Sequence, residues 1–440
     1  MYDDDVDLYK KHTQNSHNLF NKSLKQHVNG VSHNIRYFKP YPFVTKYSTG
    51  KYIIDVDKNK YIDFWMGHWS LILGHTNKTV TKNITKQVSQ GWMYGTVNEQ
   101  TIKLSEIITN TVPIAEKIRY VTTGTEAAMY AVRLARTITG KKIIAKIDGG
   151  WHGYTTDLLK AINWPFSESE SNGLINEKYI ISLPLNNLEA SLDILKTVKN
   201  NLACIIIEPV LGGGGCIPAT KEYLKGLQEF SSRNDSLFIL DEIVTGFRFR
   251  FGCIYTELDL KPDIVLLGKI VGGGLPIGII CGKKEVMNRS NTISNEKSKR
   301  AYIGGGTFST NPLTMVSGYH TLAMLKNKQI IYDKINKLGM KTRYLLNKTF
   351  GNRAAITGKG SLFMVHFLQN DISHITNAAD ASGCNKRLLY KYHFRLISNN
   401  KIFFLPGKQG ALSYAHSNED VKHLINATIK FIEVFRLQSK

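Results

Sequence analysis

The chain has 440 residues, of which 42% are hydrophobic and 21% are charged, so it can bury a large core and suits about two or three packed domains. Its formal net charge is +22, but the lysines are spread along the whole chain without a basic tail. This pattern indicates a lysine-rich solvated surface and argues against a nucleic-acid partner. No apolar run approaches the ~20 residues that cross a bilayer, and the amino terminus has no signal segment, so we expect no membrane partner and a cytoplasmic location. The five cysteines form no Cys-x-x-Cys pair, which argues against a disulfide framework and a zinc site.

The amino-terminal residues predict simple local structure. Residues 1–30 are polar with scattered leucines and predict one helix. From Phe43 to Phe64, short apolar pieces alternate with the turn signals YSTGKY and DVDKNKY, which predicts a small antiparallel sheet.

The central part of the chain alternates between strand-like and helix-like segments. Its strand-like segments include KIIAKID, ACIIIEPV, SLFILDEIV and DIVLLGK. Such apolar runs between helices are typical of an α/β domain whose largely parallel sheet is buried on both faces. After about residue 325 the pattern changes to a helix, short strands and a final helix from Glu419. We therefore expect an amino-terminal segment with a small sheet over 1–70, a large domain over 71–324 and a small carboxyl-terminal domain over 325–440.

A possible anion site lies where a predicted strand ending at Val121 runs into Thr-Thr-Gly-Thr and then a helix that Gly140 ends. Backbone N–H groups and the positive end of the helix dipole favour an anion at such a junction. Gly124 lets the backbone approach a ligand closely, and Thr125 can add a hydroxyl donor. Taken alone, the segment is more typical of an ordinary threonine-capped helix than of an anion site.

Two carboxylates follow the apolar strand SLFIL, at the edge where parallel sheets bind ligands. Strand periodicity places Asp241 and Ile243 on one side and Glu242 on the other. An acid beside an apolar contact suits a flat heteroaromatic ring, with Asp241 keeping a ring nitrogen protonated and Ile243 packing on one face. The alternative is a capping or metal-binding pair, but no nearby histidine or second acid cluster supports a metal.

Lys269 directly follows the buried strand DIVLLG and precedes the glycines Gly272–Gly274. Most lysines are solvated charges, because burying an unpaired ammonium is costly. A lysine in this place can lose its proton readily and act as a nucleophile toward a carbonyl group. The glycines also suggest a dinucleotide site, but their spacing and the missing strand-loop-helix start argue against it.

Trp151 and His152 lie between glycines just after the strand KIIAKID, again at a sheet edge. An exposed aromatic ring there can stack on the ring of a ligand. Alone, the same residues are more typical of packing.

Taken together and in this order, these segments resemble the class III aminotransferases, a family of the fold-type I pyridoxal-phosphate enzymes. The matching segments are TTGTEAAMYAVRLAR, GGWHG, IIIEPV, DEIVTGFR, LGKIVGGGLPIG and GGTFSTNPL. The resemblance covers about residues 28–435. Within the family it is strongest to the glutamate-1-semialdehyde 2,1-aminomutase subgroup, through GVSHNIRYF, DVDKNKYIDF and YAHSNEDV.

The resemblance implies a large domain with a mostly parallel, seven-stranded sheet sandwiched by helices, and a small α+β lobe built from both termini. It also implies an enzyme that moves amino groups with pyridoxal 5'-phosphate, which passes through its pyridoxamine form. Such a cofactor acts as an electron sink for the carbon beside the amine. A non-catalytic cofactor-binding partner is the remote alternative.

The resemblance also assigns roles to residues of the cofactor site. Lys269 matches the lysine that holds the cofactor as a Schiff base and carries protons, and Asp241 matches the partner of the pyridine nitrogen. Gly124 and Thr125 match the cup that binds the phosphate. Trp151, with His152 beside it, takes the place where the family stacks an aromatic residue on the ring.

Two further assignments concern the partners of the site. Thr307 in GGTFS matches a phosphate ligand donated by the neighbouring subunit, which implies a homodimer. Arg36 matches an arginine that binds the substrate carboxylate, a task suited to its planar fork. The expected partner is therefore a small amino or carbonyl substrate that carries a carboxylate.

The sequence departs from the aminomutase subgroup at three places. His33-Asn34-Ile35-Arg36 replaces the usual Ser-Pro-Val-Arg, Lys408 stands where a pocket glutamate is common, and the loop over Trp164–Gly173 differs from the usual small, glycine-rich one. A positive residue in place of an acid changes which substrate is accepted. The alternative function is therefore a transaminase that uses a separate amino donor on a β- or ω-amino acid.

Overall fold

The computed structural model describes residues 2–168, 177–293, 296–369 and 372–435, and it divides the chain into two compact units. Unit 1 consists of Met1–Asn77, Lys334–His374 and Gly383–Lys440, and unit 2 consists of Lys78–Asp333 and Ile375–Ser382. Among the described residues, no helix is both long enough and apolar enough to cross a membrane.

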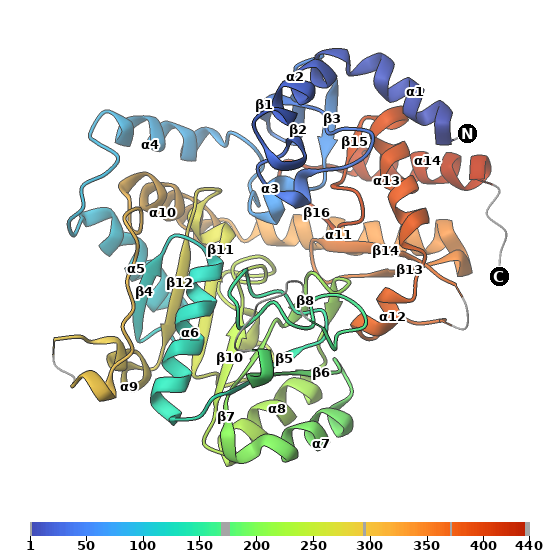
Figure 1. Ribbon diagram of the computed structural model, residues 1–440. Coiled ribbons are helices and arrows are strands. Elements are labelled where there is room, and N and C mark those ends of the chain that lie inside the picture. Colours follow the sequence, from blue (N-terminus) through green and yellow to red (C-terminus); the bar gives the residue numbers. More distant parts are fainter. Residues whose placement is uncertain (1, 169–176, 294–295, 370–371, 436–440) are drawn as a thin grey trace. The chain divides into compact units, whose positions relative to one another are not determined.

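Unit 2 is built around a seven-stranded sheet (Figure 1). Its strands, in spatial order, are β4 (Lys117–Val121), β12 (Gly278–Gly282), β11 (Ile264–Gly268), β10 (Leu237–Asp241), β7 (Leu202–Ile207), β5 (Ile143–Ile147) and β6 (Ile180–Leu183). Of these strands only β12 runs antiparallel to its neighbours. The mostly parallel sheet expected from the sequence is therefore confirmed.

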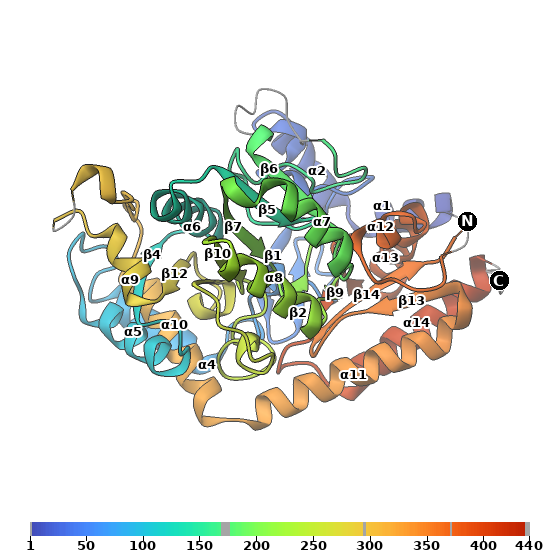
Figure 2. The ribbon, with the colours of Figure 1, turned by 90° about the horizontal axis from the view of Figure 1, so that it is seen from below.

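Helices flank this sheet. They are α4 (Lys78–Val88), α5 (Glu99–Thr111), α6 (Gly124–Thr139), α7 (Leu188–Val198), α8 (Lys221–Arg233), α9 (Lys284–Met287), α10 (Pro312–Asn327) and α12 (Ala378–Ser382). Helix α6 contacts β4, β7, β10, β11 and β12, whereas α7 and α8 pack side by side, with α7 contacting β6 and α8 contacting β7 and β10 (Figure 2). A short hairpin, β8 (Val210–Leu211) with β9 (Ile217–Pro218), follows β7.

Helix α6 shows how the sequence fixes one of these elements. Thr123 caps its amino terminus, its side chain accepting from the backbone N–H of Glu126, and the Glu126 side chain accepts in return from the Thr123 N–H. Gly140, in the left-handed conformation, ends it. The face toward the sheet carries mostly small, fully buried residues, including Ala127 and Ala131, which allow the helix to lie close to the strands.

Unit 1 contains two smaller sheets and several helices. One sheet has the order β1 (Thr45–Thr49), β2 (Tyr52–Asp55), β3 (Lys60–Asp63) and β15 (Ile402–Phe403), and the other has β13 (Ala354–Thr357), β14 (Leu362–Phe367) and β16 (Gly410–Ala411). The first three strands are antiparallel, as expected, and β15 joins β3 in parallel. The helices are α1 (Tyr2–His12), α2 (Gln14–Leu24), α3 (Met66–Trp69), α11 (Ile330–Phe350, which begins in unit 2), α13 (Lys386–Asn400) and α14 (Asn418–Phe435).

The expectation of a single helix over residues 1–30 is wrong, because the chain breaks at Thr13 into α1 and α2. Thr13 leaves the helical conformation, and its buried hydroxyl donates to the carbonyl oxygen of Tyr9. The carboxylate of Asp57 then accepts from the backbone N–H groups of Asn15 and Ser16, at 2.7 and 2.9 Å. Asp57 therefore supplies the acceptors that let α2 begin as a separate helix.

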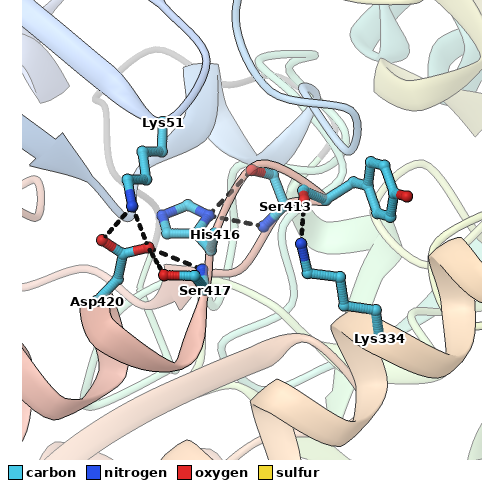
Figure 3. Close-up of polar contacts among 7 residues, drawn as sticks. Lys51, Lys334, Ser413, His416, Ser417 and Asp420 are labelled. Carbon is cyan, nitrogen blue, oxygen red and sulfur yellow. Dashed lines mark hydrogen bonds and ion pairs between the residues drawn. The ribbon is translucent and has the colours of Figure 1, made fainter.

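A buried polar network fixes the entry to α14 (Figure 3). The Asp420 carboxylate accepts from the Ser417 N–H at 2.7 Å and contacts the Lys51 ammonium at 2.6 and 2.7 Å. His416 is fully buried, and its Nδ1 accepts from the N–H and hydroxyl of Ser413 at 3.0 and 2.9 Å. Lys334 donates to the backbone carbonyl of the next residue after Ser413 at 2.8 Å. Because a backbone donor points at its Nδ1, the imidazole fits this place in its neutral form.

The folding stability of unit 1 should therefore depend on pH through His416. Burial lowers the pKa of His416 well below its usual range, so below about pH 6.5 the unfolded chain takes up a proton that the folded chain excludes. The free energy of unfolding should fall as pH decreases, at up to about 1.4 kcal/mol per pH unit for this group. His416→Asn keeps an acceptor and removes the titration, so urea unfolding should show a shallower pH dependence for this variant.

His423→Asn, at an exposed histidine of α14, is the control and should keep the wild-type pH dependence. Equal slopes for both variants would contradict the assignment.

Candidate active site

The candidate site of unit 2 lies where parallel strands end at the same edge of the sheet. Strands β7 and β10 pair in register, Ile206 opposite Ile239, and Asp241 at the end of β10 lies opposite Leu266 of β11. The residues that follow these strands therefore meet at one edge. They are Glu208 after β7, Asp241 at the end of β10, Lys269 after β11 and the loop from Gly149 after β5.

Asp241 is buried and held by two neighbours. Its Oδ2 lies 2.7 Å from His152 Nδ1, and its Oδ1 accepts from the backbone N–H of Ile243 at 3.1 Å. A carboxylate can only accept, so Nδ1 carries the proton of a neutral imidazole. Burial lowers the pKa of His152, which agrees with that neutral form. That the side chains of Asp241 and Ile243 lie on one side stays a prediction, because this contact joins Asp241 to the backbone of Ile243.

Lys269 begins the turn Lys269–Gly272 immediately after β11, with a half-buried side chain and a backbone φ of +49°. Such a conformation is uncommon for a residue with a side chain, and residues of this kind cluster at functional sites. Burial is the main reason that the pKa of Lys269 is lowered. The charges of Asp241 and Glu208 oppose this shift, and Arg248 adds to it. The amine is therefore easier to deprotonate than that of a surface lysine.

The amino terminus of α6 retains free donors beside this cluster. The Thr123 hydroxyl satisfies the N–H of Glu126, but no described residue accepts from the N–H groups of Gly124 and Thr125. A β-carbon on Gly124 would lie 2.6 Å from the Ile243 side chain, which shows how closely the helix start approaches the end of β10. The anion site stays a prediction, which these N–H donors at a helix start favour.

The loop after β5 carries Trp151 and His152 to the same place. Its Gly153 has a φ of +90°, and a β-carbon there would lie 2.4 to 2.7 Å from Thr125 atoms. The Trp151 side chain is 36% exposed and packs edge-on against Tyr154, with ring centroids 4.9 Å apart. Trp151 is therefore available to stack on a ligand ring while its backbone is fixed.

Two buried charged residues of the site were not predicted. Glu208 accepts from the N–H groups of Trp151 and Gly212 at 2.9 and 3.1 Å, and burial, followed by the charge of Asp241, raises its pKa. Lys146 is fully buried within β5, and burial lowers its pKa to about 7. Glu208 ends a buried strand just as Asp241 does, so the same argument could have found it. The position of Lys146 inside an apolar strand was the available signal for the lysine.

The remaining sequence predictions concern Thr307, Arg36, Lys408 and the loop Trp164–Gly173. Thr307 is exposed in the turn after Gly306, and a β-carbon on Gly306 would lie 3.6 Å from side-chain oxygens of Thr122 and Glu126 at the start of α6. Arg36 and Lys408 belong to unit 1. The loop Trp164–Gly173 is described only as far as residue 168, and the rest of it lies outside the described residues.

In unit 1, Arg36 is exposed at the end of the short helix Asn34–Arg36 and donates to the Ser32 hydroxyl at 2.9 Å. Lys408 is half-buried and lies beside a small cavity lined by aromatic residues that include Phe363 and Tyr392. Burial, followed by the charge of Lys386, lowers the pKa of Lys408.

The residues of unit 2 fit a phosphorylated pyridine aldehyde. The two N–H groups at the start of α6 can bind a phosphate, the Asp241 carboxylate can face a ring nitrogen, and Lys269 supplies an amine of lowered pKa. His152 Nε2 is buried without a partner among the described residues. The described residues contain no group of three or more histidine, cysteine or acidic side chains that could hold a metal ion.

Comparisons with known proteins agree with this reading. The family model described as "Aminotransferase class-III" matches residues 36–399. A protein of Archaeoglobus fulgidus named glutamate-1-semialdehyde 2,1-aminomutase is 36% identical over 427 residues, which cover 94% of this chain and 98% of that protein.

Solved structures match over nearly the whole chain. An omega-transaminase from Sphaerobacter thermophilus superposes with a TM-score of 0.86 and 26% identity, and covers 96% of this chain and 98% of its own. A glutamate-1-semialdehyde aminomutase from Pseudomonas aeruginosa gives a TM-score of 0.88 at 18% identity, with coverages of 98% and 97%. These matches confirm the expected fold class.

The close contact between the loop and α6 can be tested with Gly153→Ala. The added methyl group would meet Thr125 at less than 3 Å in a conformation with positive φ, so loop and helix must separate. We expect a loss of about 2 to 4 kcal/mol in the free energy of unfolding of unit 2, measured by chemical denaturation. Gly140→Ala is the matched control, because Gly140 also has a positive φ but nothing lies within 4 Å of its added β-carbon. The control should lose only about 1 kcal/mol. Equal losses would mean that the contact with Thr125 is unimportant.

Proposed function

The chain belongs to the class III aminotransferase family, and from this premise we propose that it is a pyridoxal-phosphate enzyme that converts glutamate-1-semialdehyde into 5-aminolevulinate by moving the amino group within one molecule. The observation that supports the reaction class is the meeting of Lys269, Asp241 and the free N–H groups of α6 at one sheet edge. The similarity to proteins named glutamate-1-semialdehyde 2,1-aminomutase, over more than nine-tenths of the chain, supports the substrate.

Different residues of unit 2 would bind different parts of the cofactor. When bound, pyridoxal phosphate supplies an electron sink that lets a carbon–hydrogen bond beside nitrogen break. The N–H groups of Gly124 and Thr125 would bind the phosphate, and Trp151 and Ile243 would contact the ring. Asp241 keeps its charge directed at the ring nitrogen, because His152 and the Ile243 N–H fix both of its oxygens.

Lys269 is the residue that holds the cofactor covalently and moves the proton. Its lowered pKa leaves a larger share of the amine neutral near pH 7, and only the neutral amine can attack a carbonyl or accept a proton. Asp241 and Glu208 stabilise its protonated form, so the same group can return the proton. The two opposing effects make Lys269 suited to both steps.

The substrate carboxylate is assigned to Arg36. Its guanidinium is exposed in unit 1, and Ser32 orients one of its nitrogens. A specific feature favours the second candidate function, a transaminase with a separate amino donor: Lys408 introduces a positive charge where the aminomutases have an acid. Removing that acid changes the preferred charge of the second substrate.

We propose that two chains form each pair of active sites, with Thr307 of one chain reaching the phosphate held by the other. Large apolar side chains support this association, because several are exposed in the single chain on segments of unit 2. They include Trp92 at 59%, Tyr302 at 67% and Phe308 at 64% exposed. Aromatic residues are enriched at subunit interfaces, and Phe308 is the direct neighbour of Thr307.

The covalent site can be identified by borohydride reduction of the yellow, cofactor-loaded protein, followed by peptide mapping. Lys146 is the alternative site of labelling to Lys269, because burial lowers the pKa of both lysines. We expect the label on one peptide that contains Lys269, since the Lys146 amine already donates to two backbone carbonyls. Lys269→Ala should abolish labelling. Label on Lys146 would refute the assignment of the whole site.

The aminomutase and the transaminase differ in single-substrate turnover. The pyridoxamine-phosphate form, given glutamate-1-semialdehyde alone, should make 5-aminolevulinate over many turnovers, because the amine given to one carbon is taken back from its neighbour. Added keto acid should leave the rate unchanged. Arg36→Ala should lower kcat/KM by about tenfold or more, the exposed charge pair being partly screened.

A transaminase would instead stop after one turnover per site until an amino donor is added. Lys408→Glu provides a further comparison, because it returns the acid of the aminomutase subgroup to this position. If Lys408 has changed the substrate, Lys408→Glu should raise single-substrate turnover relative to the wild type. Wild-type turnover that stops after one product per site would refute the aminomutase and favour the transaminase.

A further inference from the structure

A loop of unit 2, residues 149–161, carries Trp151 and His152 and closes on itself. The N–H of Gly149 donates to the carbonyl oxygen of Ala161 at 2.8 Å, so the two ends of the loop meet. Residues 149–161 therefore form a compact loop that follows β5. Its position decides where the Trp151 ring and the His152 imidazole lie.

The first half of this loop is fixed by two buried carboxylates. Asp241 holds the His152 ring, and Glu208 accepts from the Trp151 N–H. The second half presents carbonyl oxygens to the interior, where each of them requires a donor. Leu158 is fully buried, and its carbonyl oxygen is one of these groups.

Lys146 supplies the donors. Its Nζ lies 2.7 Å from the carbonyl oxygen of Lys160 and 3.1 Å from that of Leu158, and the side chain is 0% exposed. The charges of Glu208 and Asp148 partly offset the cost of burying it. Either form of the amine suffices for this contact, since even a neutral amine carries two hydrogens for two carbonyls.

We propose that Lys146 is a positioning residue, which holds the second half of loop 149–161 and so sets the place of Trp151 and His152 beside the cofactor. The contact connects Lys146, the fourth of the five residues of β5, to the far end of the loop, 12 and 14 residues along the chain. Glu208 thus accepts a hydrogen bond from the first half of the loop, and Lys146 donates to the second half. The role of Lys146 at the cofactor rests on the proposed function, whereas its hydrogen bonds to the loop do not.

Lys146→Met removes the donor and nearly preserves the volume of the side chain, and Lys146→Gln keeps an uncharged NH₂ group with two hydrogens. Lys141→Met is the matched control. Lys141 also donates to two backbone carbonyls of unit 2, those of Asn234 and Asp235, at 2.6 and 3.1 Å, in the turn before β10. A general effect of losing such a lysine would appear in the control as well.

The first measurement is hydrogen–deuterium exchange of the cofactor-free protein, followed by mass spectrometry of peptides that cover residues 149–161. Lys146→Met should exchange these amides about tenfold faster than the wild type, because the loop loses two hydrogen bonds. Lys146→Gln should recover part of the protection, and Lys141→Met should leave the loop unchanged. Unchanged exchange in Lys146→Met would overturn the proposal. If Lys146→Met does not fold, Lys146→Gln is measured alone. Its side chain is one bond shorter and should reach at most one of the two carbonyl oxygens, so exchange as slow as in the wild type would overturn the proposal.

The second measurement is the visible circular dichroism of the pyridoxal-phosphate-loaded protein, which reports the asymmetric surroundings of the bound ring. We expect a weaker band for Lys146→Met and about tenfold faster cofactor release, with kcat affected more than KM. Faster loop exchange with an unchanged band would show that Lys146 is merely structural, and would overturn the positioning role. If the wild type binds no cofactor at all, the proposed function fails. The exchange measurement still tests whether Lys146 stabilises the loop.

Discussion

Ionisable groups that are buried at the end of a parallel sheet must satisfy one another, because water cannot do so there. In unit 2 this constraint joins two acids, Asp241 and Glu208, with two lysines, Lys146 and Lys269, at adjacent strand ends. No member of this set can be removed without leaving the charge of another less compensated. The position of the loop after β5 and the orientation of the His152 imidazole follow from these contacts, whereas burial lowers the pKa of Lys269 against the charges of Asp241 and Glu208.

Much of this arrangement could be predicted from the sequence, because its signals are local. The apolar run before Asp241 and the run before Lys269 each mark a buried strand that ends in a charged residue. The Thr-Thr-Gly-Thr segment marks a helix start through its capping box. Parallel topology then brings ends that are far apart in sequence to one edge, so periodicity and the βα alternation were sufficient for these residues.

The features that sequence reasoning missed depend on partners far away in the chain. The break at Thr13 requires Asp57, 42 residues after Asn15, to supply acceptors for a new helix. Lys146 stands out inside an apolar strand, but the sequence does not show which carbonyl groups its amine meets. Neither partner leaves a mark near the residue concerned, so only the folded chain shows the contact.

Under the proposed function, the residues of the two units separate chemistry from selectivity. All residues assigned to the cofactor, apart from the partner chain's contribution, lie in unit 2 and approach one another closely, as Gly124 does to Ile243. Such tight packing tolerates little change, because even one added methyl group would collide. The residues assigned to the substrate, Arg36 and Lys408, lie in unit 1, which has its own core. A change such as the lysine at position 408 can therefore alter which substrate is accepted without disturbing the groups that hold the cofactor.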